Sequence, residues 1–250
     1  MREGRLQPSL DMNLSRLIAS LCVIAFPVAV FAQTVSPGTA LQHRYSFNDD
    51  ARDSVGHADG TLEGAAAISD GQVHLNGTPG TYVNLPGGLI AGDKAVTFEF
   101  WATLGTNRGW CRVFDQGSET FVDKGRMDLY FSPHSGGGDF RLTVMDPNPT
   151  ERVIRVRGNL DNQTNLYVAC VLNPPSGFIG IYTNGILAVS TNTLRSLESV
   201  STNRFYLGRS LFPTDPPLNG SIAEFRIYNA ALSSKEITEN FKNGPDVVPK

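Results

Sequence analysis

Short apolar segments with a period of two follow one another along almost the whole chain from His43 onward. Each is rich in β-branched and aromatic residues, and each ends in a cluster of Gly, Pro, Asn or Asp that is typical of turns. Examples are HRYSF, TYVNL, VTFEFWATL, DLYFS, YVACVLN and SIAEFRIY, with NGTPG, LPGG, HSGGGD, NPPSG and TDPPLNG between such segments. Many short strands joined by tight turns predict an antiparallel all-β sandwich or barrel.

One hairpin and one helix are specified locally. In FIGIYTNGILAVS, Asn184 and Gly185 supply the two positive φ angles that a type I′ turn requires. Ser233 and Glu236 form a capping box at the start of the only convincing helix, which Gly244 is expected to end. The fold class is therefore all-β with one short C-terminal helix.

The chain reads as four segments: an N-terminal signal peptide (1–32), a leader (33–40), one domain (41–243) and a tail (244–250). No internal linker, repeat or low-complexity stretch divides the long segment. We therefore predict a single β-sandwich domain after the signal peptide.

The N-terminal segment has the pattern of an export signal. Residues 17–32 are an uncharged run, and Val30 and Ala32 place small side chains at the cleavage site. The run is short for a transmembrane helix, which needs about 20 residues. An uncleaved anchor is the alternative, and Met12 competes with Met1 as the true start. We expect a secreted or cell-surface protein with no membrane span after signal removal.

Charge excludes one class of partner. The formal net charge is −3, and no run rich in Lys and Arg occurs. Proteins that bind nucleic acid usually carry a basic patch or stripe. Nucleic acid is therefore not an expected partner.

Cysteine usage leaves one question open. Cys22 belongs to the signal segment, so the mature chain keeps Cys111 and Cys170. A pair of cysteines in an exported protein permits a disulfide. Both residues lie in strand-like segments, where cysteine often acts as a small buried apolar residue. Two buried thiols are favoured slightly over a disulfide.

The order of the motifs resembles the laminin G-like jelly-roll domain of the concanavalin A-like lectin/glucanase superfamily. The motifs that carry the resemblance are HRYSFND…DSVGHADGTLEG, GTYVNLPGGL…AVTFEFWATL, WCRVFDQG with DLYFSPHSGGG, LYVACVLNPPSGFIGIYTNGILA, and LGRSLFPTDPPLNGSIAEFRIYNAALSSKEI. They cover residues 41–240. The resemblance implies an antiparallel jelly-roll β-sandwich of two sheets, one convex and one concave, with the first and last strands side by side.

Catalysis is tested by looking for paired acids, because the superfamily includes glucanases. Retaining glycosidases place two carboxyl groups about 5 Å apart, which on one strand needs acids two positions apart. Glu99, Asp115 and Glu224 each stand alone on their strands. The histidines are scattered, and neither a G-x-S-x-G elbow nor a zinc motif occurs. We expect no enzyme, and glycoside hydrolysis is kept only as an alternative.

A calcium site is a further expectation. Asn48 and Asp53 lie in the acidic loop NDDARDSVGHAD, and Ca²⁺ takes six to eight oxygen ligands. The implied neighbourhood of first and last strands would let Glu224 complete the site. Ala223 stands where the family commonly has an acid, which weakens this expectation. The alternatives are a solvated acidic turn and a Glu224 paired with Arg226 or another arginine, and a structural role for Glu224 is expected first.

Long, Pro- and Gly-rich loops are the expected ligand-binding elements, because binding residues concentrate in loops on a rigid scaffold. Trp110, His134 and Asp215 are the candidate ligand-binding residues, with ordinary connecting loops as the alternative. Trp101, in a strand that is apolar on both faces, is expected in the core. The most consistent function is non-catalytic recognition of carbohydrate, an inference from the resemblance alone. A protein-binding or adhesion module of the cell surface is the first rival.

Overall fold

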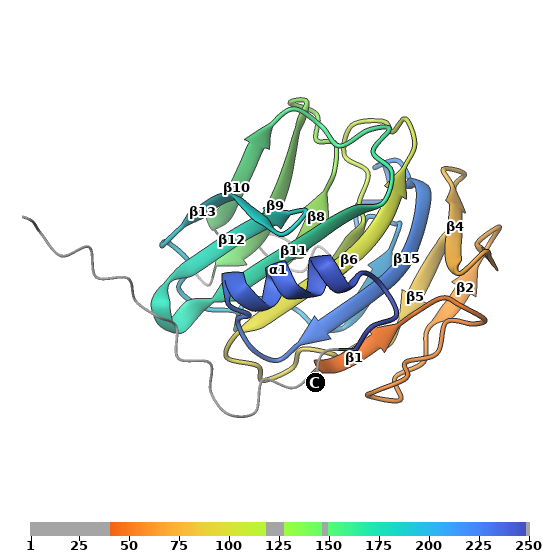
Figure 1. The fold of residues 1–250 in the computed structure, drawn as a ribbon. Helices are drawn as coiled ribbons and strands as arrows, with labels where there is room; N and C mark the ends of the chain where they lie inside the picture. Colours follow the sequence, from red (N-terminus) through yellow and green to blue (C-terminus); the bar gives the residue numbers. More distant parts are fainter. Residues whose placement is uncertain (1–40, 119–127, 147–149, 249–250) are drawn as a thin grey trace, which may run out of the picture. The chain divides into compact units, whose positions relative to one another are not determined.

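The structure, a computed structural model, describes residues 41–118, 128–146 and 150–248. The expected signal peptide and leader lie outside these residues, and the expected tail is described only to residue 248. The described chain forms two antiparallel sheets packed face to face, with one helix on the outside (Figure 1). This confirms the predicted sandwich.

The first sheet has eight strands and joins both ends of the domain. In order across the sheet, its strands are β13 (Ile186–Thr191), β12 (Phe178–Thr183), β11 (Leu166–Asn173), β6 (Val96–Leu104), β15 (Asn219–Tyr228), β4 (Gln72–Asn76) and β3 (Ala67–Ser69). The first strand, β1 (Leu41–Tyr45), also pairs with β15, the last strand. The expected contact between the first and last strands is therefore present.

The second sheet has seven strands. In order, they are β10 (Thr150–Arg157), β9 (Asp139–Asp146), β8 (Leu129–Ser132), β7 (Phe114–Gly117), β14 (Arg204–Leu207), β5 (Tyr82–Leu85) and β2 (Thr61–Glu63). Both sheets interleave strands that are distant in sequence, as β14 between β7 and β5 shows.

Aromatic residues fill the space between the sheets. Phe98 and Phe100 on β6 face Phe114, and the ring centroids of Phe98 and Phe114 are 4.8 Å apart. Phe205 and Phe225 complete the cluster from β14 and β15. Full burial of one such side chain stabilises the fold by about 1.5–3 kcal/mol. This cluster fixes which face of every strand points outward.

Helix α1 (Ser234–Asn243) covers part of the outer face of the eight-stranded sheet (Figure 1). Its N-terminus has the predicted capping box: the Ser233 hydroxyl accepts from the backbone N–H of Glu236, whose carboxylate accepts from the N–H of Ser233. Ile237 is buried in a second apolar cluster with Trp101 and Tyr167. Trp101 is therefore buried as expected, but under the helix rather than between the sheets.

Two local predictions are also confirmed. Asn184 and Gly185 have φ angles of 49° and 78° and turn the chain between β12 and β13. Cys111 and Cys170 are both buried and free, so the pair does not form a disulfide. Burial raises the pKa of the Cys111 thiol to about 12.

The strands β10 and β13 end the two sheets and lie against each other at one side of the sandwich.

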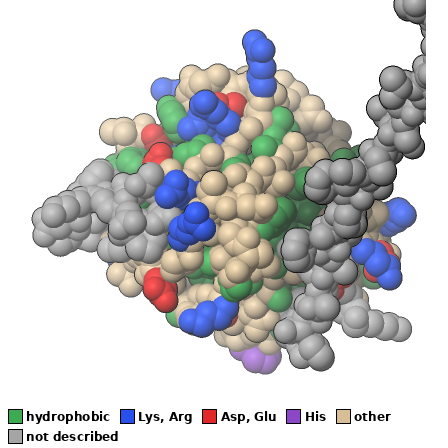
Figure 2. Space-filling view, turned by 90° about the vertical axis from the view of Figure 1, so that its left-hand side faces the viewer, with side chains coloured by type: hydrophobic (Ala, Val, Ile, Leu, Met, Phe, Trp, Pro, Cys, Tyr) green, Lys and Arg blue, Asp and Glu red, His purple; other side chains and the backbone are tan. Residues whose placement is uncertain are grey.

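Figure 2 shows Lys and Arg side chains scattered over the side turned to the viewer, with Asp and Glu beside several of them. Within the described ranges, no helix is both long enough and apolar enough to cross a membrane.

Candidate functional site

Two tyrosines form a platform on the outer face of the seven-stranded sheet. Val83 and Leu207 point into the core, so alternation along β5 and β14 turns Tyr82 and Tyr206 outward. Their rings meet edge to face with centroids 5.1 Å apart. The guanidinium carbon of Arg209 lies 4.8 Å from the Tyr82 centroid and 4.6 Å from the Tyr206 centroid. The arginine thus holds both rings in place by cation–π contact.

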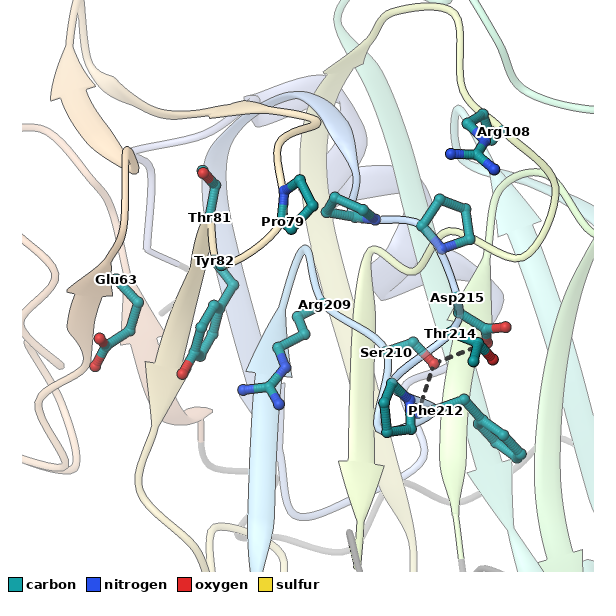
Figure 3. Close-up of a pocket in the computed structure, with 14 residues that line it drawn as sticks. Glu63, Pro79, Thr81, Tyr82, Arg108, Arg209, Ser210, Phe212, Thr214 and Asp215 are labelled. Atoms are coloured by element: carbon teal, nitrogen blue, oxygen red, sulfur yellow. Dashed lines mark hydrogen bonds between the residues drawn. The ribbon is translucent and has the colours of Figure 1, made fainter.

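A pocket of about 610 Å³ opens beside this platform (Figure 3). We call it the tyrosine pocket. Glu63 on β2 borders it on one side of Tyr82 and Arg209, and Asp215 and Arg108 border it on the other. Its size and its mixture of an aromatic surface with a few polar groups are typical of ligand sites.

The loop after β14 forms one wall of the pocket and is braced by its own polar groups. The Ser210 hydroxyl donates to Asp215 Oδ2 at 2.9 Å and accepts from the Phe212 N–H at 3.0 Å (Figure 3). Pro216 and Pro217 follow in the same wall. Prolines and these hydrogen bonds restrict the loop before any ligand arrives, which lowers the ordering cost of binding.

Arg112 joins this loop to the rest of the face. It is only 1% exposed, and its Nη2 donates to Asp215 Oδ2 at 3.0 Å. Its Nη1 donates to the carbonyl of Trp110 at 2.6 Å, and its guanidinium carbon lies 3.9 Å from the Tyr130 ring centroid. Burial raises the pKa of Tyr130, although the charge of Arg112 opposes this. Arg112 therefore fixes Trp110 and Asp215 relative to each other.

Trp110 is held in a strained backbone conformation. Its φ is 77°, a left-handed value that bulky side chains rarely adopt. Its N–H donates to the carbonyl of His134 at 2.7 Å, and its ring lies against Gly136, where a Cβ would come within 2.3 Å of the indole nitrogen. The Arg141 guanidinium carbon is 4.9 Å from the ring centroid, and the residue is still 36% exposed. Such strain persists where surrounding contacts enforce it, often at functional sites.

His134 positions Trp110 through its backbone. Its imidazole Nδ1 lies 2.9 Å from Asp161 Oδ2 and is thereby tied to the neighbouring loop. The structure thus brings the three predicted ligand-binding residues into one network: Asp215 and Trp110 meet at Arg112, and Trp110 meets His134. Only Asp215 lines the tyrosine pocket itself.

Asp115 and Asp215 bring two carboxylates close together, which bears on hydrolysis. Their Oδ2 atoms lie 3.4 and 2.9 Å from the same Ser210 hydroxyl, and both acids contact Arg112. Asp115 is fully buried and accepts the N–H of Leu211 at 3.0 Å. A glycosidase must present both carboxyl groups to the sugar. This pair instead braces the loop after β14.

The predicted calcium ligand Asp53 is occupied by donors from the protein. Burial alone would raise the pKa of Asp53, but its hydrogen bonds outweigh burial and hold the pKa below the ordinary value. Its two oxygens accept the backbone N–H groups of Arg44, Val55, Gly56 and Ala58 and contact the imidazole of His43. The carboxylate closes the turn after β1.

Glu224 and Asn48 lie close to Asp53 through Arg44. Arg44 donates from Nε and Nη2 to the two Glu224 oxygens at 2.9 and 2.8 Å, and Arg226 donates to the same carboxylate. The Asn48 amide donates to Asp246, whose N–H donates to Glu224 at 2.8 Å. The alternative of a Glu224 paired with arginine is thus what the structure contains.

These donor sets do not fit a calcium ion. Calcium needs oxygen lone pairs directed at it, whereas the oxygens of Asp53 and Glu224 accept N–H groups and Glu224 faces two guanidinium groups. Among the described residues, no group of three or more His, Cys, Asp or Glu is arranged to hold a metal. The calcium site stays a prediction for solution experiments.

A buried network that the sequence did not indicate surrounds Glu99 on the other sheet. Glu99 accepts from the hydroxyls of Tyr167 and Tyr228 at 2.5 and 3.0 Å and from the amide of Asn240 on α1 at 2.9 and 3.1 Å. Burial raises its pKa, although these donors and Arg226 oppose the shift. The network fastens helix α1 to the sheet.

The match to a sequence family agrees with this architecture. The model of the concanavalin A-like lectin/glucanases superfamily matches residues 76–238. The chain belongs to this superfamily. No curated protein matches the sequence.

Solved structures share the fold at low identity. Domain 4 of AbnA, a GH43 extracellular arabinanase from Geobacillus stearothermophilus solved with arabinotriose, is 24% identical with a TM-score of 0.63, over 80% of this chain and 98% of that one. The binding domain of botulinum neurotoxin serotype D/C is 15% identical with a TM-score of 0.66, over 81% of this chain and 52% of that one. This lectin-superfamily chain thus spans about half of the toxin domain. At these identities the likeness shows the fold alone.

Proposed function

We propose that the protein is an exported, non-catalytic module that binds carbohydrate in the tyrosine pocket. The observation that carries the proposal is the half-buried ring of Tyr82, held by the buried Tyr206 and by Arg209, at the edge of a pocket lined by acids and bases. A sugar ring has an apolar C–H face that packs on an aromatic ring and hydroxyl groups that need both donors and acceptors. Arg108 and Arg209 are the bases that line the pocket, and Glu63 and Asp215 are the acids.

Family and fold support the proposal. The superfamily description includes lectins, and the AbnA domain was solved with arabinotriose. A carbohydrate-binding module of Ruminococcus gnavus sialidase has a similar fold, with a TM-score of 0.50 over 59% of this chain and 82% of that one. The AbnA enzyme is described as extracellular, which agrees with the export signal expected at residues 1–32. Binding without hydrolysis agrees with the bracing role of Asp115 and Asp215.

The test is binding of purified protein to a broad panel of glycans and polysaccharides, measured for the wild type, Tyr82→Ala and Tyr82→Phe. We expect Tyr82→Ala to lower affinity about tenfold, as the loss of a central aromatic contact often does. Tyr82→Phe keeps the ring and is expected to bind within about threefold of the wild type. Equal binding by the wild type and Tyr82→Ala would place the sugar elsewhere, and no binding to any glycan would overturn the proposal.

A calcium arm of the same experiment tests the metal prediction. Repeating the panel with calcium and then with a chelator separates a calcium-dependent lectin from a calcium-independent one. Since N–H donors occupy Asp53 and Glu224, we expect unchanged binding. Loss of binding on chelation would restore the predicted site at Asn48, Asp53 and Glu224.

One observation favours the adhesion module as the second candidate. Ile186 and Leu187 on β13 are 73% and 44% exposed at the edge of the eight-stranded sheet. Exposed apolar side chains on an edge strand suit contact with another protein. Weaker binding of Ile186→Lys than of the wild type to an extracellular protein, with glycan binding unchanged, would support this function.

A further inference from the structure

The tyrosine pocket does not end at the rim of its own sheet. A second pocket of about 260 Å³, the connecting pocket, shares four of its lining residues: Pro79, Arg108, Pro216 and Pro217. A third of about 480 Å³, the amide pocket, shares Asn76 and Asn219 with the connecting pocket. Neighbouring pockets in this row therefore share part of their walls.

The amide pocket lies on the outer face of the other sheet. Val73 and Leu75 of β4 point into the core between the sheets, so Gln72, His74 and Asn76 point outward. The row of pockets therefore starts on the outer face of the seven-stranded sheet. It passes over one end of the sandwich and finishes on the outer face of the eight-stranded sheet.

The floor of this path is rigid backbone. Asn219 donates its N–H to Asn107 Oδ1 at 2.7 Å, and Asn107 Nδ2 donates to the carbonyl of Asn219 at 3.1 Å. A Cβ at Gly105 would lie 2.6 Å from Asn219 Nδ2, and one at Gly220 would lie 2.5 Å from the carbonyl of Thr103. Both glycines line the amide pocket, so backbone packed closely against other backbone and against the Asn219 side chain forms its base.

Unused hydrogen-bonding groups face the amide pocket. The Gln72 side-chain oxygen accepts from Ser221, and the Asn76 side-chain oxygen accepts from Thr78. Within the described part of the chain, neither amide NH₂ group donates a hydrogen bond to protein. Asn76 is exposed and Gln72 half-buried, so both donors are open to a ligand.

The charge along the path is balanced. The tyrosine pocket has two acids, Glu63 and Asp215, against two bases, Arg108 and Arg209. No Asp, Glu, Lys or Arg lines the amide pocket. A polyanionic chain would meet no Lys or Arg in the amide pocket, whereas a neutral polyhydroxylated chain meets amides and hydroxyls there and proline rings in the connecting pocket.

We propose, on the basis of the carbohydrate-binding function above, that the three pockets act as one groove for a neutral linear polysaccharide. One sugar packs on Tyr82, the chain crosses the prolines of the connecting pocket, and later sugars accept hydrogen bonds from Gln72 and Asn76. The tyrosine pocket and the amide pocket form the two ends of this groove, one on each sheet.

The test is a length series. Affinities are measured by calorimetry for neutral arabino-, xylo- and gluco-oligosaccharides from the disaccharide to the octasaccharide, with sialylated glycans as the anionic comparison. In the series that binds, we expect affinity to rise about tenfold, or 1.4 kcal/mol, between short and long members. Stronger binding of sialylated glycans than of every neutral chain would overturn the assignment of a neutral ligand.

Two isosteric variants test whether the amide pocket causes the rise in affinity with chain length. Asn76→Asp and Gln72→Glu keep the oxygen that the protein uses and replace the free donor. Both should lower affinity for the long oligosaccharides about fivefold to tenfold and leave the disaccharide unchanged. Asn192→Asp, an exposed amide that lines none of the three pockets, is the control and should bind like the wild type.

The outcomes separate this inference from the proposed function. If short oligosaccharides bind at Tyr82 but length has no effect, the proposed function stands and the extended groove is wrong. A gain with length that Asn76→Asp leaves intact reflects only the larger number of binding positions on a longer chain, and it overturns the groove too. If no oligosaccharide binds, the proposed function itself fails.

Discussion

The outer faces of the two sheets carry the same kinds of residue, but in different surroundings. On the eight-stranded sheet, Glu99, Glu224 and Arg226 are completely buried, and helix α1 and the chain after it cover them. On the seven-stranded sheet, Tyr82 and Arg209 are only half-buried and border an open pocket. An acid, an arginine and an aromatic ring occur on both faces. Whether other parts of the chain cover them decides whether they stabilise the fold or stay open to a ligand.

On the covered face, buried charged groups contact one another and stabilise the fold. The Arg226 guanidinium carbon lies 4.5 Å from the Trp101 ring centroid, and Arg226 donates to Glu224 and to the carbonyl of Val247. Water cannot replace any of these partners, so each is needed for stability. The open face has the same cation–π geometry at Arg209, but there a ligand can replace water. We therefore expect substitutions to reduce stability on the first face and binding on the second.

Removing one charge of an ion pair on each face should give a large loss of stability on the covered face and a smaller one on the open face. Glu224→Gln removes the carboxylate that Arg44 and Arg226 contact and leaves the buried Arg226 guanidinium with the more distant Glu99, 3.9 Å away. It should lower the free energy of unfolding by about 3 kcal/mol. Asp215→Asn is the matched change on the open face. Arg112 keeps the carbonyl of Trp110 and the Tyr130 ring there, so we expect a loss below about 1.5 kcal/mol. Urea unfolding of both variants measures the difference, and equal losses would contradict the comparison.

The pH dependence of stability separates the two buried acids of the covered face. Burial opposes ionisation of Glu224, but Arg44 and Arg226 outweigh it and hold its pKa below the ordinary value. Its contribution is therefore present above the ordinary pKa and lost as pH falls through the folded pKa. Burial raises the pKa of Glu99, so its contribution is present below the ordinary pKa and lost as pH rises through the folded pKa.

Urea unfolding of the wild type, E224Q and E99Q at a series of pH values tests these signs. The difference in free energy of unfolding between the wild type and E224Q should shrink on acidification, because the wild type then loses its ionised carboxylate as well. The free energy of unfolding of E99Q should rise relative to that of the wild type as pH rises, because the Gln side chain never has to ionise in the core. Parallel curves for all three proteins would show that neither acid has a shifted pKa.

The comparison also explains what the sequence could and could not predict. Alternation along each strand and the turn residues between strands predicted the sandwich, the hairpin at Asn184 and the capping box at Ser233, because local chemistry determines each of them. The strands β2, β3 and β4 were not among the predicted segments. β2 and β3 are only three residues long, and β4 alternates Val and Leu with polar residues, so it was open to detection.

The site was harder to predict, because distant segments build it. Tyr82 could have been found, since alternation in TYVNL sets Tyr82 and Asn84 against Val83 and Leu85. The role of Arg112 could not, because it depends on a loop residue, Asp215, that reaches it only in the folded chain. The same reason hid the Asn240 contact with Glu99.

The helix cap gives a smaller effect on the covered face. Ser233→Ala removes the acceptor for the N–H of Glu236 and half of the capping box. We expect a loss of about 1 kcal/mol in the free energy of unfolding, with unchanged glycan binding, since α1 lies on the other sheet from the tyrosine pocket. Lys235→Ala, at an exposed position of the first turn, is the control and should cost less. A change in binding would mean that the two faces are coupled.

The smallest expected effect on stability comes from Trp110, for which Trp101 on the covered face is the contrast. Trp101→Ala, under the helix, should cost about 3–5 kcal/mol. Trp110→Gly removes a ring of similar size, but glycine adopts a φ of 77° without strain. This relief offsets the lost contacts with Gly136 and Arg141, so we expect a change within about 0.5 kcal/mol in urea unfolding. A loss above about 2 kcal/mol would make Trp110 a structural residue like Trp101. A small loss together with weaker glycan binding would extend the binding face from Tyr82 to Trp110.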